Sequence, residues 1–327
     1  MMDVALTRRD IMRRAAGAAL ACAAGGLFGC EPNPPLRIAV QPWVGYQFIF
    51  LAGLEGWLPS DGLQLLETKN NPESIAALVE NRVDGAALTL DGVLSLRDQG
   101  IAVSAVMVFD VSAGADAVLA KPDIQSLAGL KGKRIGVEAS SLGAIMLAKA
   151  LDAGGLKQEE LTVESMDFDH VATWDGGDLD AIITYEPALS QLLARGLVRI
   201  FDSRSLPQMI VDVLAVRPEV AERSPHALRG LIAAHFQALR LWHSNPIDTA
   251  YRLATRLGVK PDGVKNVFKG LDLPDALYNR QYLAAPAAEL TRSAEEMAQI
   301  MASAGMLKNP LRLDNLFLPD YLPGEGG

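Results

Sequence analysis

The chain has 327 residues, half of them apolar, and a net charge of −9 at pH 7. A chain of this length and apolar content can bury more than one core, so we expect two lobes. Its acidic balance shows no basic face or stripe of the kind that binds nucleic acid, which excludes a nucleic-acid partner. Both cysteines, Cys22 and Cys30, lie within the first 30 residues. The rest of the chain therefore has no disulfide, thiolate metal site or cysteine nucleophile.

Residues 1–30 have the pattern of a signal peptide that ends in a lipobox. Four arginines between positions 8 and 14 precede an uncharged run of small and apolar residues over 15–28. This run is too short and too rich in Ala and Gly to favour a transmembrane helix. It ends in Leu-Phe-Gly-Cys, and we expect cleavage before Cys30 and lipidation of its thiol. Two alternatives stay open, which are lipidation at Cys22 after a very short apolar run and an ordinary signal peptide with a chance cysteine.

The export route is also left open. Residues 7–13 (Thr-Arg-Arg-Asp-Ile-Met-Arg) resemble a twin-arginine signal, and an ordinary Sec signal with extra arginines fits equally well. Residues 31–35 (Glu-Pro-Asn-Pro-Pro) predict a stiff, extended tether. No later segment has the pattern of a membrane-spanning helix. We therefore expect a protein held by a lipid on the periplasmic or extracellular face of an inner or outer membrane.

The body alternates strands with helices, which is the βαβ rhythm of a parallel sheet covered on both faces. The first pass has strands at 36–40, 63–67, 85–88 and 102–109, with helices at 48–58, 72–80 and 92–99. After a break at 112–114, a second pass has strands at 115–120, 134–137, 161–166, 181–184 and 198–201, with helices at 142–153 and 187–194. A strand at 210–216 predicts a return to the first lobe, and helices follow at 225–242, 247–257, 261–271 and 288–304.

The two passes contain a weak internal repeat. Residues 81–88 parallel residues 177–184, because each has a polar turn, an apolar residue, an Asp and then a strand of small residues. In both passes the next residues leave the strand at the carboxyl edge of a sheet, where open α/β sheets bind ligands. Two such edges facing each other would form a cleft. Unrelated helix-to-strand connections of the same composition remain the alternative.

Two aromatic residues follow the first strand of the first lobe. Trp43 and Tyr46 flank Gly45 in a loop at the expected cleft edge. We interpret the aromatics as a rim around the ligand and Gly45 as a point where the backbone approaches it closely. The alternative is that both rings fold into the core.

Polar residues follow two strands of the second lobe. Ser140 and Ser141 precede a helix, whose free N–H groups and dipole suit an anionic group, although either serine could simply cap the helix. Tyr185 and Glu186 come before Pro187, at the start of the next helix. They are interpreted as a donor and an acceptor at the cleft edge, or as a plain strand-to-helix turn.

Further candidate residues come from a group of acidic side chains. If they face the cleft they favour a cationic or amine-bearing ligand, and otherwise they serve the hinge and the helix caps. The group comprises Asp91 with the neighbouring Thr89, Asp110, Asp116 and Asp212.

Catalytic patterns are sparse. No two of the four histidines (170, 226, 235 and 243) stand at a metal-ligand spacing with a carboxylate, and the last three lie in the C-terminal helical region. The chain has no GxSxG elbow, Walker A loop or GxGxxG motif. We therefore expect no catalytic residue, metal or cofactor.

Taken in chain order, these motifs resemble the nitrate/taurine/sulfonate/thiamine-precursor class of ABC-transporter solute-binding proteins. The segments that carry the resemblance are the lipobox, 43–46, 84–87, 110–116, 134–137, 140–143, 180–181, 184–187 and 212–214. The resemblance implies a type II periplasmic-binding fold, in which two α/β lobes and a helical C-terminal region close around a two-stranded hinge. The first lobe would comprise residues 36–112 with 214–327, and the second 113–213. Residues 170–177 look shorter than the helix that the family has there.

The resemblance implies a monomeric, extracytoplasmic binding component that works with ABC permease and ATPase subunits. It would capture a small polar or zwitterionic solute by lobe closure. A ligand sensor for a signalling partner is an alternative. A second alternative is an enzyme similar to thiamine-pyrimidine synthase, which shares the scaffold but relies on a histidine and a cysteine cluster. The cysteine-free body argues against that enzyme.

Overall fold

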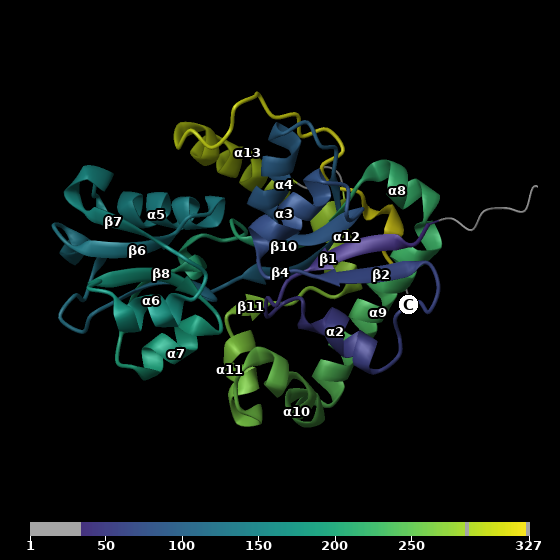
Figure 1. Cartoon of the computed structure of the whole chain (residues 1–327), viewed down its shortest axis with the longest axis horizontal. Helices are drawn as coiled ribbons and strands as arrows, with labels where there is room; N and C mark the ends of the chain where they lie inside the picture. Colours follow the sequence, from purple (N-terminus) through teal and green to yellow (C-terminus); the bar gives the residue numbers. More distant parts are fainter. Residues whose placement is uncertain (1–33, 285–287, 325–327) are drawn as a thin grey trace, which may run out of the picture. The chain divides into compact units, whose positions relative to one another are not determined.

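Two β-sheets with helices on both faces form the part of the chain that the structure describes (Figure 1). The computed structural model describes residues 34–284 and 288–324. The predicted signal peptide, Cys22, Cys30 and most of the tether lie outside these residues. Within them, no helix combines the length and the apolar character needed to cross a membrane.

Each sheet is mixed rather than wholly parallel, which differs from the expectation. The first has the order β11-β4-β10-β3-β1-β2, in which β10 and β11 run opposite to the other four strands. The second has the order β7-β6-β8-β5-β9, in which β5 runs opposite to the other four strands. The strands of the first sheet are β1 (Leu36–Val40), β2 (Leu63–Glu67), β3 (Gly85–Thr89), β4 (Ser104–Ser112), β10 (Val211–Val216) and β11 (Leu271–Asp272). Those of the second are β5 (Asp116–Ala120), β6 (Arg134–Glu138), β7 (Thr162–Met166), β8 (Ala181–Tyr185) and β9 (Val198–Asp202).

The helices cover both faces of each sheet. In Figure 1, α3 and α4 lie on one face of the first sheet and α2 and α9 on the other, while α5 lies opposite α6 and α7 on the second. The helices that alternate with the strands of the two sheets are α2 (Gln47–Leu54), α3 (Asn71–Val79), α4 (Leu90–Asp98), α5 (Ser141–Gly154), α6 (His170–Gly176) and α7 (Ala188–Ala194). The C-terminal helices are α8 (Pro218–Arg223), α9 (Pro225–Ser244), α10 (Pro246–Leu257), α11 (Val264–Phe268), α12 (Ala276–Leu283) and α13 (Ala288–Ser303).

All predicted strands are present, and the main departures lie in the short elements. β11, α6, α8 and α12 were not predicted, and the helix expected at 261–271 is reduced to α11. The shortened helix and β11 are accounted for by a long-range contact of the backbone at Gly270. Its carbonyl accepts hydrogen bonds from the N–H groups of Ala113 and Ala115, at 2.8 and 3.1 Å. A Cβ at position 270 would overlap the backbone of Ala115, so the close approach requires glycine.

The internal repeat seen in the sequence corresponds to a repeated hydrogen-bond pattern. Asp84 before β3 accepts a bond from the N–H of Arg37 on β1, at 2.9 Å. Asp180 before β8 accepts one from the N–H of Arg134 on β6, at 3.0 Å. In both pairs the Asp also donates its own N–H to the arginine carbonyl, at 2.8 and 2.9 Å. β3 and β8 hold the same position in their sheets, between a parallel strand and an antiparallel one.

The chain passes between the two sheets twice. It leaves β4 after Ser112 and enters β5 at Asp116, and it returns between β9 and β10, over residues 203–210. The two crossings bind each other, because the Ser203 hydroxyl lies 2.7 Å from both the Ser112 hydroxyl and the N–H of Gly114. β10 pairs with the first sheet from Val211 onward. The lobe boundary expected at residue 213 therefore falls inside a strand.

His235 is a buried polar residue in an aromatic part of the core. It is fully buried on α9, and its ring packs edge-on against Phe48, Phe109 and Phe236, with centroids 5.1 to 6.0 Å away. Neither ring nitrogen has a hydrogen-bond partner among the described residues. Burial lowers the pKa of His235 to about 3, so the ring stays neutral at physiological pH.

We predict that His235→Leu retains stability at pH 7 and reduces the loss of stability in acid. The pKa of His235 is lower in the folded than in the unfolded chain, so protons favour unfolding as the pH falls below 6.5. At pH 5 this linkage costs about 2 kcal/mol. Urea unfolding of both proteins at pH 7 and 5 measures the difference. Equal acid sensitivity of the two proteins would contradict the prediction.

Candidate functional site

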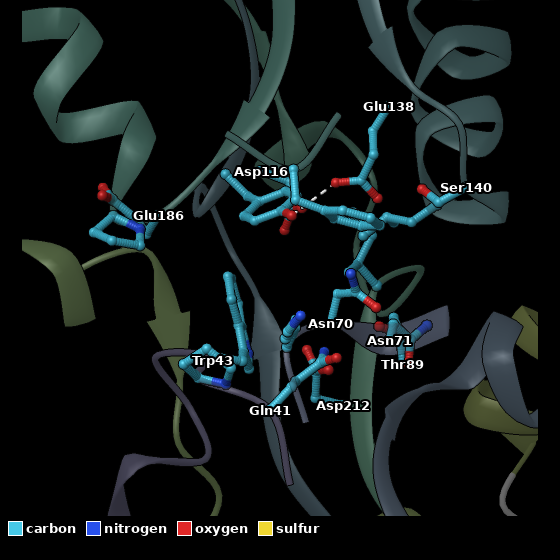
Figure 2. A pocket seen from close by; sticks show the side chains of 17 residues that line it. Gln41, Trp43, Asn70, Asn71, Thr89, Asp116, Glu138, Ser140, Glu186 and Asp212 are labelled. Carbon is cyan, nitrogen blue, oxygen red and sulfur yellow. Dashed lines mark hydrogen bonds between the residues drawn. The ribbon is translucent and has the colours of Figure 1, made fainter. Parts of the chain in front are cut away.

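A cavity of about 200 Å³ is lined by residues from both sheets. Figure 2 shows Asp116 and Glu138 from the second sheet on one side of it, and Gln41, Trp43 and Asp212 from the first on the other. Most of its polar lining residues lie at carboxyl ends of strands or at helix starts, as predicted for two facing carboxyl edges, whereas Asp116 and Asp212 stand at the beginnings of β5 and β10. The lining residues are Gln41, Pro42, Trp43, Lys69, Asn70, Asn71, Thr89, Asp116, Glu138, Ser140, Leu142, Phe168, Tyr185, Glu186, Pro187, Ile210 and Asp212.

Trp43 and Tyr185 form an aromatic wall that spans the two sheets. Their rings meet edge to face, with centroids 5.8 Å apart and an interplanar angle of 80°. The indole Nε1 of Trp43 donates to Asp110 Oδ2 at 3.1 Å, which fixes the plane of the ring. Both residues were predicted from their positions after a strand, and the structure brings them together.

Tyr46 and Gly45 do not line the cavity, which corrects the prediction of an aromatic rim. Tyr46 is fully buried, its hydroxyl donates to Asp212 Oδ1, and its ring packs on Phe109 at 4.8 Å. Position 45 requires glycine, because the carboxylate of Asp110 occupies the space where a Cβ would lie. The loop thus turns one aromatic toward the cavity and the other toward the core.

Asp110 and Asp212 form a buried carboxyl pair beneath the cavity. They face each other across β4 and β10, where Asp212 also stands opposite Thr89 of β3. Asp212 and Thr89 line the cavity, whereas Asp110 lies behind them. Burial raises the pKa of Asp212 to about 7. Burial, together with the charge of Asp212, also raises the pKa of Asp110.

Asp91 and Ser141 bind each other instead of lining the cavity. The Ser141 hydroxyl, at the start of α5, donates to Asp91 Oδ2, on α4 over the first sheet. Burial raises the pKa of Asp91 to about 6, although the Ser141 bond opposes the shift. This contact joins the two sheets. The neighbouring Ser140 lines the cavity and caps α5 by accepting the N–H of Gly143 at 3.1 Å, so it has both predicted positions.

Glu138 is the centre of a hydrogen-bond network on the second sheet. Its Oε2 accepts the Tyr185 hydroxyl at 2.7 Å and lies 3.2 Å from Nε2 of His170. His170 is buried, and its Nδ1 lies 3.0 Å from the Thr184 hydroxyl. Burial opposes ionisation of Glu138, but hydrogen bonds from His170, Ser140 and Tyr185 outweigh it and hold its pKa below the usual value. Glu138 therefore presents a negative charge to the cavity.

Glu186 lies at the side of the cavity with its carboxylate turned toward α7 (Figure 2). Its Oε1 accepts the Ser190 hydroxyl at 2.8 Å, and its Oε2 accepts the Ser190 N–H at 3.2 Å. Burial raises its pKa to about 7. The prediction that Glu186 stands at the cleft edge agrees with this position, but its oxygens serve the helix start.

Several lining residues were missed as candidates. Glu138 was not among the predicted candidates, whereas Asp116 was predicted within the acidic group. His170, which binds Glu138 from outside the lining, was considered only for its spacing from other histidines. Lys69, Asn70 and Asn71 received no attention. The sequence pattern of the turn before α3 could have indicated a helix start there, since Asn70 caps the helix and Glu73 accepts a hydrogen bond from the N–H of Lys69. Among the described residues, no group of three or more His, Cys, Asp or Glu could hold a metal ion.

A family model, described as the NMT1-like family, matches residues 29–258. The chain belongs to this family. A Brucella abortus (strain 2308) protein named only as a binding protein is 24% identical over 312 residues, which cover 90% of this chain and 93% of that one. The taurine-binding periplasmic protein of Escherichia coli (strain K12) is 25% identical over 182 residues, 53% of this chain and 57% of that one.

Solved structures share the fold. The periplasmic aliphatic sulphonate binding protein SsuA from Escherichia coli superposes with a TM-score of 0.71 at 19% identity, covering 87% of this chain and 96% of that one. The desulfurization enzyme DSZB superposes with a TM-score of 0.64 at 18% identity, covering 88% and 97%. The predicted bilobal binding-protein fold is thus confirmed. The same scaffold is found in binding proteins and in an enzyme.

We predict that Tyr46→Phe lowers the free energy of unfolding by about 1–3 kcal/mol, because it leaves a buried Asp212 oxygen without its donor. The hydroxyl favours ionised Asp212, so its removal raises the folded-state pKa of that carboxyl further. The decrease in the free energy of unfolding should therefore be larger at pH 8 than at pH 6. Urea unfolding at both pH values measures it. Tyr251→Phe, on an exposed tyrosine, is the control, and equal effects of the two changes would refute the assignment.

Proposed function

We propose that this chain is the extracytoplasmic solute-binding component of an ABC importer and captures a small polar solute between two lobes. The observation that carries the proposal is the cavity itself, which takes its walls from the strand ends of two similar sheets. Membership of the NMT1-like family, and relatives named as taurine- and sulphonate-binding proteins, support it. Permease and ATPase subunits would be the partners.

Closure of the two lobes fits the positions of the crossings. We propose lobes made of residues 36–112 with 211–324, and of residues 113–202, with the return crossing at 203–210. Three contacts join them at the cavity and beside it, namely Trp43 with Tyr185, Ser141 with Asp91, and Lys149 of α5 with Glu296 of α13. Helix α5 also packs against α4 and α13 at this place. Hinge motion at the two crossings would open the cavity.

A binding role accounts for the site better than catalysis does. The cysteines lie outside the cavity-bearing residues, and Glu138 and His170 are held by other protein groups. We propose that the chain is no enzyme, although DSZB uses the same fold. We further propose that it acts as a monomer, needs no cofactor, and is exported by the twin-arginine or Sec route to the periplasmic or outer face of a membrane.

Binding is tested by a thermal-shift screen of small sulfonates, amines, nitrate and pyrimidines. A solute present at a hundred times its Kd stabilises the folded protein by about 2.7 kcal/mol. Trp43→Ala should weaken binding of the solute so identified at least tenfold, or about 1.4 kcal/mol, because it removes one wall of the cavity. Calorimetry measures the affinity, and melting curves of the unliganded proteins measure the stability.

The matched control is Trp174→Ala, since Trp174 is also half-buried but lies on α6 and outside the cavity lining. It should leave the affinity unchanged. If Trp43→Ala binds as tightly as the original protein, Trp43 does not touch the solute. If its melting point collapses, Trp43 acts in the core.

The proposed lipid anchor is tested at Cys30. Cys30→Ser should release the protein from the membrane fraction or leave its precursor uncleaved, because the lipid is attached through the thiol. Cell fractionation with immunoblotting measures both outcomes, and Cys22→Ser is the control. Unchanged membrane association of the Cys30 variant would contradict the anchor, and release by the Cys22 variant alone would move it to that residue.

A further inference from the structure

The wall of the cavity carries an excess of negative charge. Its acidic lining residues are Asp116, Glu138, Glu186 and Asp212, and its one basic residue among the described lining is Lys69. Lys69 is exposed, so water screens its ammonium group. The carboxyl groups are all buried, and their charges act through less water.

Most of these carboxyl groups are satisfied by the protein. Glu138 is held by Tyr185 and His170, Glu186 by Ser190, and Asp212 Oδ1 by Tyr46. Asp116 is different. It is only 2% exposed, and its Oδ2 has no hydrogen-bond partner among the described residues. A buried carboxylate oxygen without a donor is costly, so it indicates a donor that comes from outside the chain.

Two further unpartnered atoms in the cavity wall are also acceptors. Gln41 Oε1 and Asn71 Oδ1 are buried and accept no hydrogen bond from the described residues. When it is ionised, the Asp116 carboxylate can only accept. The buried, unpartnered oxygens of the wall therefore require hydrogen-bond donors from the solute.

We propose that the solute carries a protonated nitrogen group, an ammonium or amidinium, which donates to Asp116 Oδ2 and is neutralised by Glu138 and Asp212. The inference deepens the proposed binding function and rests on it. Trp43 and Tyr185 stand on the same wall, where aromatic faces and edges can pack around the carbon part of such a group. The sulphonate named for one relative is an anion, which carries no donor for these oxygens and would meet four carboxyl groups.

Binding of a cation should release protons near neutral pH. Burial raises the pKa values of Asp116 and Asp212 to about 7, so each carries a proton part of the time. A cation favours the ionised forms, and its affinity should rise as the pH increases through 7. Other charged and titratable groups also face this region, namely Asp91 on α4, Asp110 on β4, Glu138 on β6, Tyr185 on β8, Glu186 before α7 and Lys69 before α3. Arg199 and Arg204, which lie beside the crossing, are paired with Asp202.

The test uses probes of matched shape and opposite charge. Calorimetry compares propylammonium with propanesulfonate, and benzylammonium with phenylmethanesulfonate, at millimolar concentrations. At least one ammonium probe should bind, at least tenfold more tightly than its sulfonate partner. Heats measured in two buffers of different ionisation enthalpy should show proton release at pH 7. The proposal is overturned if neither ammonium probe binds, or if the sulfonates bind as tightly.

The variant Asp116→Asn removes the charge while keeping the shape of the side chain. It should weaken binding of the ammonium probe at least tenfold and reduce the proton release. Asp123→Asn, on an exposed aspartate of the same lobe outside the cavity, should change neither. Melting curves check that both variants fold. Unchanged ammonium binding by a folded Asp116→Asn protein would overturn the proposal.

The outcomes separate this inference from the proposed function. If nitrate or a sulfonate binds and the ammonium probes do not, the binding function stands and the cationic solute is wrong. If no compound of either charge stabilises the protein in the thermal-shift screen, both fall together.

Discussion

The burial of Asp110 and Asp212 on adjacent strands determines the conformation of the loop that forms one wall of the cavity. Two carboxyl groups so close together and away from water are tolerated only with donors or a bound proton. Tyr46 supplies one donor and Trp43 the other, from a single loop after β1. Gly45 leaves room for the Asp110 carboxylate between them. The loop that forms one wall of the site is thus shaped by the acid pair beneath it.

The repeated sheets explain how two walls come to face each other. In each, an Asp before the central strand locks the backbone of the first strand, at Arg37 and at Arg134. The first strands, β1 and β6, therefore end in comparable places, and their next residues line the cavity. The crossings at 113–115 and 203–210 bind each other through Ser203. The repeat fixes the positions of the walls, while the side chains after each strand set their chemistry.

Local pattern predicted the strands and the segments that reach the cavity, because both depend on periodicity and on the carboxyl ends of strands. It could not predict which side of a loop faces inward. Trp43 and Tyr46 are three residues apart and both aromatic, so the sequence does not distinguish them. The hydrogen bond from Tyr46 to Asp212, a residue distant in the sequence, accompanies the burial of Tyr46 in the core. The predicted wall position of Ser141 is likewise wrong, because its hydroxyl binds Asp91. Glu138 and His170 are 32 residues apart, and their role in the site becomes evident only from the contact between their side chains.

A shared scaffold therefore says little about the charge of a solute. SsuA and this chain superpose over most of their lengths, yet their sequences are 19% identical, so few lining residues need be common. In this chain the second sheet contributes an ionised Glu138, held by His170 and Tyr185, and an Asp116 whose outer oxygen has no donor. An anion at this point would add to the negative field of buried carboxyl groups, which water screens less than it screens surface charges. The unpartnered oxygens around the cavity, Asp116 Oδ2 among them, thus constrain the solute more tightly than the family does, since the protein supplies them no donor.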